Sequence, residues 1–153
     1  MITDKRVFYP KILMIFTKST KYALRALIFI AGRCEENENC SIRDVAGTLD
    51  IPFHFLTKIL QKLTEAGLLV STKGTNGGVR LSRSPDAIIL NEIILAIDSE
   101  YSTHECVLGF PTCDDKNPCA LHSIWQEPKE SLERIVMKTT LSALLKNKEL
   151  IKL

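Results

Sequence analysis

The sequence predicts a mainly α-helical fold with a small β-hairpin. It contains three amphipathic helical patterns, then two short strand-like segments joined by a glycine-rich turn, and later a long apolar stripe. The chain has 153 residues, 45% hydrophobic and 25% charged, which is ordinary for a globular protein with one well-buried core. No stretch reaches the roughly 18 unbroken apolar residues of a membrane span. No signal peptide is recognisable, so we expect a cytoplasmic protein without a membrane partner.

The first residues, 1–13, show no sustained period, and we expect an extension there, with Met14 as an alternative start. Regular structure is predicted to begin with a helix over residues 19–33, which the polar run 35–39 ends. Apolar side chains recur at helical spacing at Tyr22, Ala23, Ala26, Leu27 and Ile30. We expect this face to lie in the core.

Two shorter helices are predicted next. Ser41 and Asp44 are spaced as in a capping box and predict a helix that begins after Ser41. Pro52 then suits the first position of a third helix, and Gly67 is expected to end that helix as a left-handed cap. The side chains that face inward on the third helix are Leu56, Ile59, Leu60 and Leu63.

A β-hairpin is predicted from residues 68–71 and 79–82, which read as two short strands. The turn between them, residues 74–78, is rich in glycine, which tolerates a positive φ. Three short helices followed by a hairpin constitute a winged helix-turn-helix. We therefore assign residues 14–85 to a DNA-binding domain.

The remaining residues, 86–153, are predicted to hold a sensor loop and dimerisation helices. A helix is predicted over residues 90–97, and the sensor loop follows over residues 98–122. A long helix is predicted over residues 121–138, and a short helix over residues 140–145. Pro128 interrupts the long helix and either kinks it or begins its main part. A long apolar stripe beside a small domain predicts a homodimer, with packing inside the chain as the alternative.

The charge is distributed unevenly along the chain. Residues 1–85 hold 13 Lys+Arg against 7 Asp+Glu, and residues 86–153 hold 7 against 11, so the halves carry +6 and −4. A basic N-terminal half suits a polyanionic partner such as double-stranded DNA, although a basic surface can also be merely solvated.

Three cysteines and a histidine fall in one loop rich in turn-forming residues, at Cys106, Cys113, Cys119 and His122. Thiolates bind zinc or iron–sulfur clusters, and an imidazole can complete the ligand shell. Spacing alone does not decide between an iron–sulfur cluster, a zinc ion and a thiol switch. Five cysteines without an export signal indicate a reducing compartment and favour metal or redox chemistry over a disulfide framework.

Cys34 and Cys40 flank the acidic run Glu35-Glu36-Asn37-Glu38-Asn39, with five residues between them. A second metal site is one interpretation of this spacing. Free cysteines at helix edges are more often small apolar fillers. We therefore predict that these two residues are free cysteines without ligand roles.

Several short motifs together carry a family resemblance: Lys21-Tyr22-Ala23-Leu24, Ile51-Pro52-x-x-Phe55-Leu56-x-x-Ile59-Leu60-x-x-Leu63, Ala66-Gly67-Leu68-Leu69, Gly74-x-x-Gly77-Gly78 and the cysteine loop. In their order, from about Met14 to Leu145, they resemble the IscR-like, or Rrf-two, winged-helix transcription regulators of bacteria. The resemblance implies a homodimer that inserts the third helix into successive major grooves and lays the wing along the backbone or minor groove.

The resemblance also implies an iron–sulfur cluster, 2Fe–2S or 4Fe–4S, held by the three loop cysteines. His122 matches the histidine ligand of the family, and the rivals for the fourth position are His104, Glu105 and Asp98, because some members use carboxylates, including one from the partner subunit. The first cysteine gap has six residues here, where the best-known members have five, which leaves the cluster type open. Zinc is the alternative.

Contacts with DNA are expected from the third helix and the wing. The first two turns of the helix offer base contacts at His54, Phe55, Thr57 and Lys58, although Phe55 can instead hold the helix to the core. Phosphate contacts are expected from Lys62, Lys73, Arg80 and Arg83, with a solvated basic face as the alternative. The glycines that either admit DNA close to the backbone or only form the turn are Gly74, Gly77 and Gly78.

The predicted function is that of a DNA-binding transcriptional regulator, a repressor, which senses iron–sulfur, redox or nitric oxide status through a cluster in the Cys106–His122 loop. One alternative is a regulator of the same fold that senses through zinc, thiols or a protein partner. A second is a redox or cluster-handling protein that does not bind DNA. An enzyme is not expected, because no phosphate loop and no nucleophile–base pair is recognisable.

Overall fold

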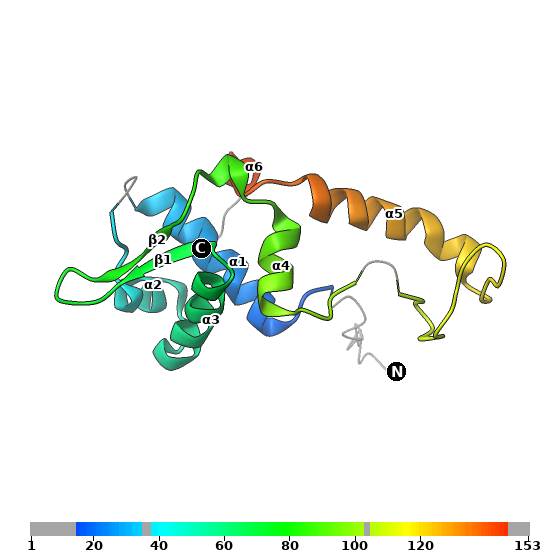
Figure 1. The fold of residues 1–153 in the computed structure, drawn as a ribbon, viewed down its shortest axis with the longest axis horizontal. Helices are drawn as coiled ribbons and strands as arrows, with labels where there is room; N and C mark the ends of the chain where they lie inside the picture. The colour runs from blue at the N-terminus through cyan, green and yellow to red at the C-terminus, as the bar shows by residue number, and fades with distance from the viewer. Residues whose placement is uncertain (1–14, 35–37, 103–104, 147–153) are drawn as a thin grey trace, which may run out of the picture.

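The computed structural model describes residues 15–34, 38–102 and 105–146 (Figure 1). The extension predicted over residues 1–13, together with Met14, lies outside the described residues. In chain order the elements are α1 (Lys18–Arg33), α2 (Ile42–Leu49), α3 (Phe53–Glu65), β1 (Leu69–Thr72), β2 (Gly78–Leu81), the short helical turn η1 (Pro85–Ala87), α4 (Leu90–Ile97), α5 (His122–Lys138) and α6 (Leu141–Leu145). No helix in these ranges is both long and apolar enough to cross a membrane.

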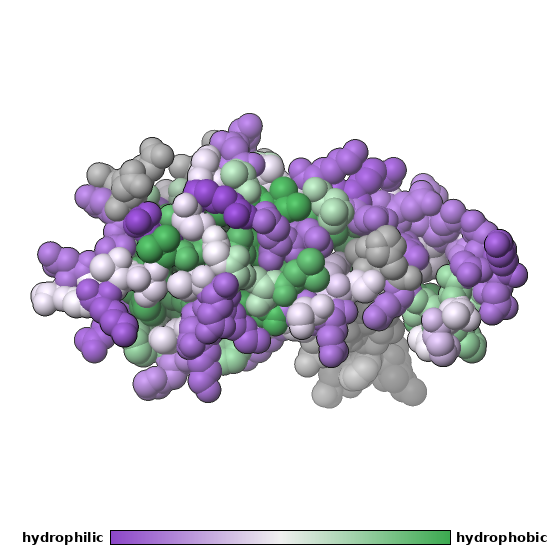
Figure 2. Space-filling model, viewed as in Figure 1, coloured by the Kyte–Doolittle hydropathy of each residue, from purple (hydrophilic) through white to green (hydrophobic). Residues whose placement is uncertain are grey.

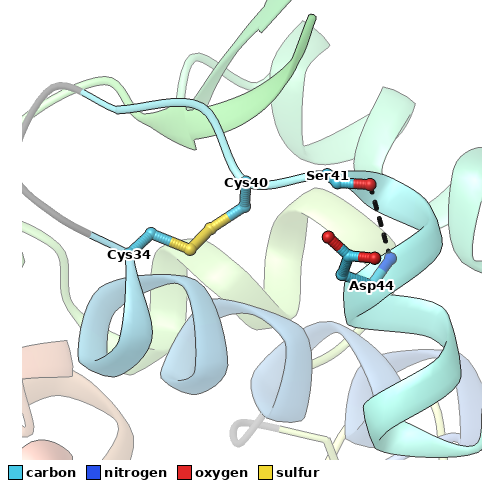
Figure 3. The surroundings of a disulfide bond; sticks show 4 residues. All are labelled: Cys34, Cys40, Ser41 and Asp44. Atoms are coloured by element: carbon cyan, nitrogen blue, oxygen red, sulfur yellow. Dashed lines mark hydrogen bonds between the residues drawn. A yellow bond between two sulfur atoms is a disulfide. The ribbon is translucent and has the colours of Figure 1, made fainter. Parts of the chain in front are cut away.

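Helices α1, α2 and α3 pack together through the apolar faces that the sequence pattern predicts. The Ser41 hydroxyl accepts a hydrogen bond from the Asp44 N–H at 3.5 Å, so Ser41 caps α2 as predicted (Figure 3). Large side chains that are fully buried in this core include Leu27, Leu49, Leu56, Leu60 and Leu63. Removal of these groups from water is the main force that holds the helices against one another.

The two ends of α3 test two predictions. Gly67 has a φ of 74°, and the Leu68 N–H donates to the Leu63 carbonyl at 2.9 Å, as in a Schellman motif. The predicted left-handed cap is therefore confirmed. Pro52 is the N-cap and not the first helical residue, because its ψ of 126° is still outside the helical region.

Strands β1 and β2 form an antiparallel hairpin, the wing, with Leu69 opposite Leu81 and Thr72 opposite Gly78. A third segment joins the hairpin at Cys40, which exchanges backbone hydrogen bonds with Val79 at 2.8 and 3.0 Å. Gly78 lies so close to this segment that a Cβ atom would collide with the Cys40 carbonyl. The wing is thus attached to the segment that precedes α2.

The prediction of free cysteines at positions 34 and 40 is wrong, because a disulfide bond joins Cys34 to Cys40 (Figure 3). Cys34 is the C-cap of α1 and has an extended backbone, and Cys40 pairs with Val79 of β2. The two Cα atoms are 6.0 Å apart, a usual separation for a disulfide.

Helices α4 and α6 complete the body, with α4 packed against α1 and α3 and α6 packed against α1 (Figure 1). The segments before them pair with each other, since the Leu90 N–H donates to the Thr139 carbonyl and the Leu141 N–H to the Ile88 carbonyl, both at 2.8 Å. A small second cluster, made of Leu90, Ile94 and Val136, joins α4 to the last turns of α5.

Helix α5 extends away from the body along the long axis of the molecule. Its N-terminal end adjoins the cysteine loop, which lies at the opposite end of the molecule from the wing (Figure 1). It is continuous through Pro128, and Val136 is its one buried residue. On the face drawn in Figure 2 the region of α5 is largely hydrophilic, whereas hydrophobic side chains gather near the cysteine loop. Most of α5 is therefore not held by packing within the described chain.

Candidate metal centre and DNA-binding surface

The three loop cysteines converge on one point. The sulfur atoms of Cys106, Cys113 and Cys119 all lie within 4.8 Å of one another, and all three residues are half-buried. Two tight turns produce this arrangement. Gly109 adopts a φ of 74° after Cys106, and the Asp114 carboxylate accepts 2.9 Å hydrogen bonds from the N–H groups that follow it.

His122, the first residue of α5, faces the same cluster of sulfur atoms. Its Nδ1 lies 3.2 Å from the Cys113 sulfur, and its Nε2 lies 3.1 Å from the Asp115 carboxylate. A histidine that ligates a metal commonly has its second nitrogen held by a carboxylate in this manner. Asp115 was not predicted from the sequence, although a pair of adjacent acids inside a cysteine loop was a signal that could have indicated it.

The sulfur atoms differ in their tendency to ionise. Burial raises the pKa of Cys106, but hydrogen bonds from the backbone N–H groups of Phe110 and Leu108, with help from the neighbouring sulfurs, lower it to about 7. At Cys113 a backbone hydrogen bond from Cys119 lowers the pKa, but burial and the two neighbouring sulfurs outweigh that bond and raise it. The loop thus holds one sulfur that readily becomes a thiolate, the form that binds metals.

A cavity of about 320 Å³ opens over these groups. Its lining includes the three cysteines, His122 and Glu105. Of the predicted rivals for the fourth ligand, Glu105 therefore lies beside the sulfurs, Asp98 caps the C-terminal end of α4, and His104 lies outside the described residues. The donor set, three soft sulfurs with an imidazole, fits both an iron–sulfur cluster and zinc.

The residues predicted to contact bases lie on the first turns of α3, where most of them are exposed. His54 and Lys58 face solvent. Thr57 is half-buried, and its hydroxyl donates to the Phe53 carbonyl at 2.8 Å. Phe55 is 37% exposed and meets the Tyr22 ring edge-on at 5.7 Å, so it also holds α3 against α1.

The cations predicted to contact phosphates lie at several places around α3 and the wing. Lys73 is exposed at the wing tip, and Arg80 is half-buried on β2. Lys62 donates to the Ile97 carbonyl at 3.4 Å, and Arg83 forms an ion pair of 2.5 Å with Glu92. Backbone and carboxylate partners therefore engage these last two side chains.

The wing glycines have different roles. Gly74 has a φ of 111° and open space beside it. Gly77 and Gly78 each leave no room for a Cβ atom, because backbone carbonyls of Thr72 and Cys40 occupy that space. These two glycines are thus required by the packing of the wing itself.

Comparison with known proteins places this arrangement in a family. The profile of the Rrf2 family, described as iron-dependent transcriptional regulators, matches residues 16–147. The HTH-type transcriptional regulator NsrR of Geobacillus kaustophilus is 32% identical over 136 residues, which cover 88% of this chain and 92% of the relative. The match thus spans most of both proteins.

Two solved structures share the fold. CymR of B. subtilis, described as the global cysteine regulator, superposes with a TM-score of 0.72 at 23% identity and covers 86% of this chain and 96% of its own. IscR of T. potens superposes with a TM-score of 0.65 at 25% identity, with 90% of each chain covered. These likenesses confirm the predicted fold, a mainly helical winged helix-turn-helix with one small hairpin.

Proposed function

Because the chain belongs to the Rrf2 family of iron-dependent transcriptional regulators, we propose that it is a dimeric repressor whose affinity for double-stranded operator DNA depends on an iron–sulfur cluster. The family is one of DNA-binding transcription regulators and not of enzymes. The observation that carries the finer proposal is the convergence of three sulfurs and His122 at the start of α5.

The proposed ligands are Cys106, Cys113, Cys119 and His122. Cys106 supplies a sulfur whose pKa is lowered to about 7, and Asp115 fixes the orientation of the His122 ring. A bound cluster supplies a centre that oxygen, nitric oxide or a shortage of iron can alter. The cluster type, 2Fe–2S or 4Fe–4S, does not follow from the donor set.

The proposed signal path runs through α5. His122 is the first residue of this helix, so closure of the loop around its ligand constrains the end of α5. The proposed dimer contact consists of the exposed apolar N-cap residue Leu121 and the exposed apolar residues of α5, Ile124, Trp125 and Ile135. A change in their packing would alter the spacing of the two copies of α3, and a coupling of about 1–3 kcal/mol would suffice to regulate DNA affinity.

The proposed DNA surface comprises α3 and the wing, within a DNA-binding domain over residues 14–85. His54, Phe55, Thr57 and Lys58 would face base edges, and the exposed positions of His54 and Lys58 support this. Lys62, Lys73 and Arg80 would contact phosphates. Gly74 would let the wing backbone approach DNA, because the space beside it is open.

The decisive experiment is an anaerobic purification followed by visible absorption and by iron, sulfide and zinc analysis per chain. We expect iron and acid-labile sulfide in equal amounts, with absorption in the visible. The same preparation should shift promoter DNA in a salt-sensitive manner, because phosphate contacts release counterions. A chain that takes up no metal after anaerobic reconstitution would contradict the cluster proposal, and a chain that binds no DNA at low salt would contradict the DNA proposal.

A zinc ion is the second candidate at the same site. Three sulfurs and one imidazole are the donor set of a structural zinc site. The three sulfurs lie within 4.8 Å of one another, and the His122 Nδ1 lies 3.2 Å from the Cys113 sulfur. In that case the measurement of iron, sulfide and zinc per chain would find zinc alone. DNA binding would then respond to thiol oxidation or to a partner.

A further inference from the structure

The Cys34–Cys40 disulfide lies near the wing, at the opposite end of the molecule from the cysteine loop (Figures 1 and 3). The two sulfurs differ in access. Cys34 is half-buried at the end of α1, whereas Cys40 is only 5% exposed. A reagent from solution can therefore reach the disulfide from the Cys34 side.

A cavity of about 400 Å³ lies on that side, with a size typical of small-ligand pockets. Cys34 lines it together with Arg80, Arg83 and Glu38. Two arginines and one glutamate thus belong to the lining, and Arg83 is also paired with Glu92 outside it. The cavity favours a small ligand that carries a negative charge.

The other sulfur is attached to the wing. Cys40 exchanges two backbone hydrogen bonds with Val79 of β2, and the Asn39 side chain donates to the Asn76 carbonyl at 3.3 Å. The disulfide therefore ties the segment that pairs with β2 to the end of α1. Breaking it would detach this segment from the end of α1, so that among the described residues the hydrogen bonds of Asn39 and Cys40 to the hairpin would lose their anchor.

We propose that the Cys34–Cys40 pair is a reversible thiol–disulfide exchange site for a small anionic thiol, and that its oxidation state sets how firmly the wing is held. This site is separate from the loop cysteines, and it does not depend on the presence of a cluster there.

The thiol–disulfide exchange takes place in two steps. A thiolate RS⁻ attacks the Cys34 sulfur, the bond to Cys40 breaks, and its electron pair leaves on the Cys40 sulfur, which takes up a proton. A second RS⁻ attacks the RS sulfur of the mixed disulfide and releases Cys34 as a thiolate. Two thiols are thereby oxidised to RSSR while one protein disulfide is reduced to two thiols, and RSSR drives the reverse reaction.

The first test measures exchange on the full chain with two probes of opposite charge, 3-mercaptopropionate and cysteamine. Each rate is divided by the rate of the same thiol with a small model disulfide, which removes its intrinsic reactivity. Peptide mass spectrometry separates this pair from the loop cysteines. We expect the mixed disulfide on Cys34 and a preference of about tenfold for the anionic thiol, because the guanidiniums concentrate anions in the cavity.

The matched variants are Arg80→Gln, which removes a cation from the cavity, and Lys73→Gln, which removes one from the wing tip. The preference should fall toward one in Arg80→Gln and persist in Lys73→Gln. Equal normalised rates in the wild type, a mixed disulfide on Cys40, or failure of the pair to form under excess RSSR would each overturn the exchange site.

The second test reports on the wing without DNA. Hydrogen exchange of the Cys40 and Val79 amides should become at least fivefold faster when the pair is reduced, because both amides are protected by the bridge that the disulfide anchors. Amides of the Val70–Arg80 pair serve as the control, because this pair exchanges its hydrogen bonds within the hairpin itself, two residues along the ladder from the Leu68–Ser82 bond. Unchanged exchange at Cys40 and Val79 would overturn the link to the wing, whatever the protein does with metal or DNA.

Discussion

The helix-turn-helix body and the arm that extends from it are stabilised in different ways. The body buries large side chains from α1, α2, α3, α4 and α6 in one core. The arm, defined here as residues 105–135, has no buried residue at all. The body thus supplies its own stability, whereas the arm leaves its three sulfurs half-buried and several large apolar side chains exposed. A bound metal centre and a second copy of the chain are the proposed complements.

The largest expected effect is in the arm. Cys113→Ala removes one of three converging sulfurs, so metal content per chain should fall to near zero while the far-ultraviolet circular dichroism of the body is unchanged. Cys34→Ala removes a sulfur outside the arm and serves as the control, with full metal content expected. An unfolded Cys113→Ala protein would show that the loop is needed for folding and that the two regions are not separable.

The body should respond to a core truncation that the arm tolerates. Leu56 is fully buried, and Leu56→Ala should lower the free energy of unfolding by about 3 kcal/mol through lost burial and the cavity left behind. Leu108 is 48% exposed, and Leu108→Ala should change it by about 0.5 kcal/mol or less. Urea denaturation of both variants measures the difference. Similar losses would mean that the loop packs against the body in solution.

The next effect concerns the face of α5. Ile124 and Ile135 are 69% and 55% exposed, and at 3.6 residues per turn they point in directions only about 20° apart. Ile124→Asp should weaken the dimer by about 100-fold, because it places a charge in the proposed apolar contact. Ser123→Asp adds the same charge on a different side of the helix and should have little effect. Sedimentation equilibrium measures both, and equal effects would move the dimer contact away from this stripe.

Within the body, features set by neighbouring residues could be predicted from the sequence, whereas a contact between distant segments could not. The bounds of α4, residues 90–97, and the left-handed Gly67 follow from local periodicity and backbone preference, and both are confirmed. The Cys34–Cys40 bond could not be predicted in this way. The two cysteines approach each other because Cys40 pairs with Val79, a contact that is distant along the chain and that no local pattern contains.

The arm was predicted differently. Its cysteines were recognised from residue type and spacing, and the structure brings their sulfurs together. Asp115 was missed, because the orientation of a carboxylate toward His122 depends on the path of the turn between them. The continuity of α5 through Pro128 was left open, since both a kink and a new start were compatible with the pattern.

The smallest predicted effect distinguishes the sulfurs within the arm. In metal-free protein the pKa of Cys106 is about 7, so its thiolate forms above that pH and is lost below it, whereas the pKa of Cys113 is raised. Iodoacetamide reacts with the thiolate, so the alkylation rate of Cys106 should rise about tenfold from pH 6 to pH 8 with a midpoint near 7. Cys113 should still be rising above pH 8, and peptide mass spectrometry separates the two. Identical profiles would mean that the backbone N–H groups of Phe110 and Leu108 do not hold the Cys106 sulfur in solution, and that the loop takes this shape only around its ligand.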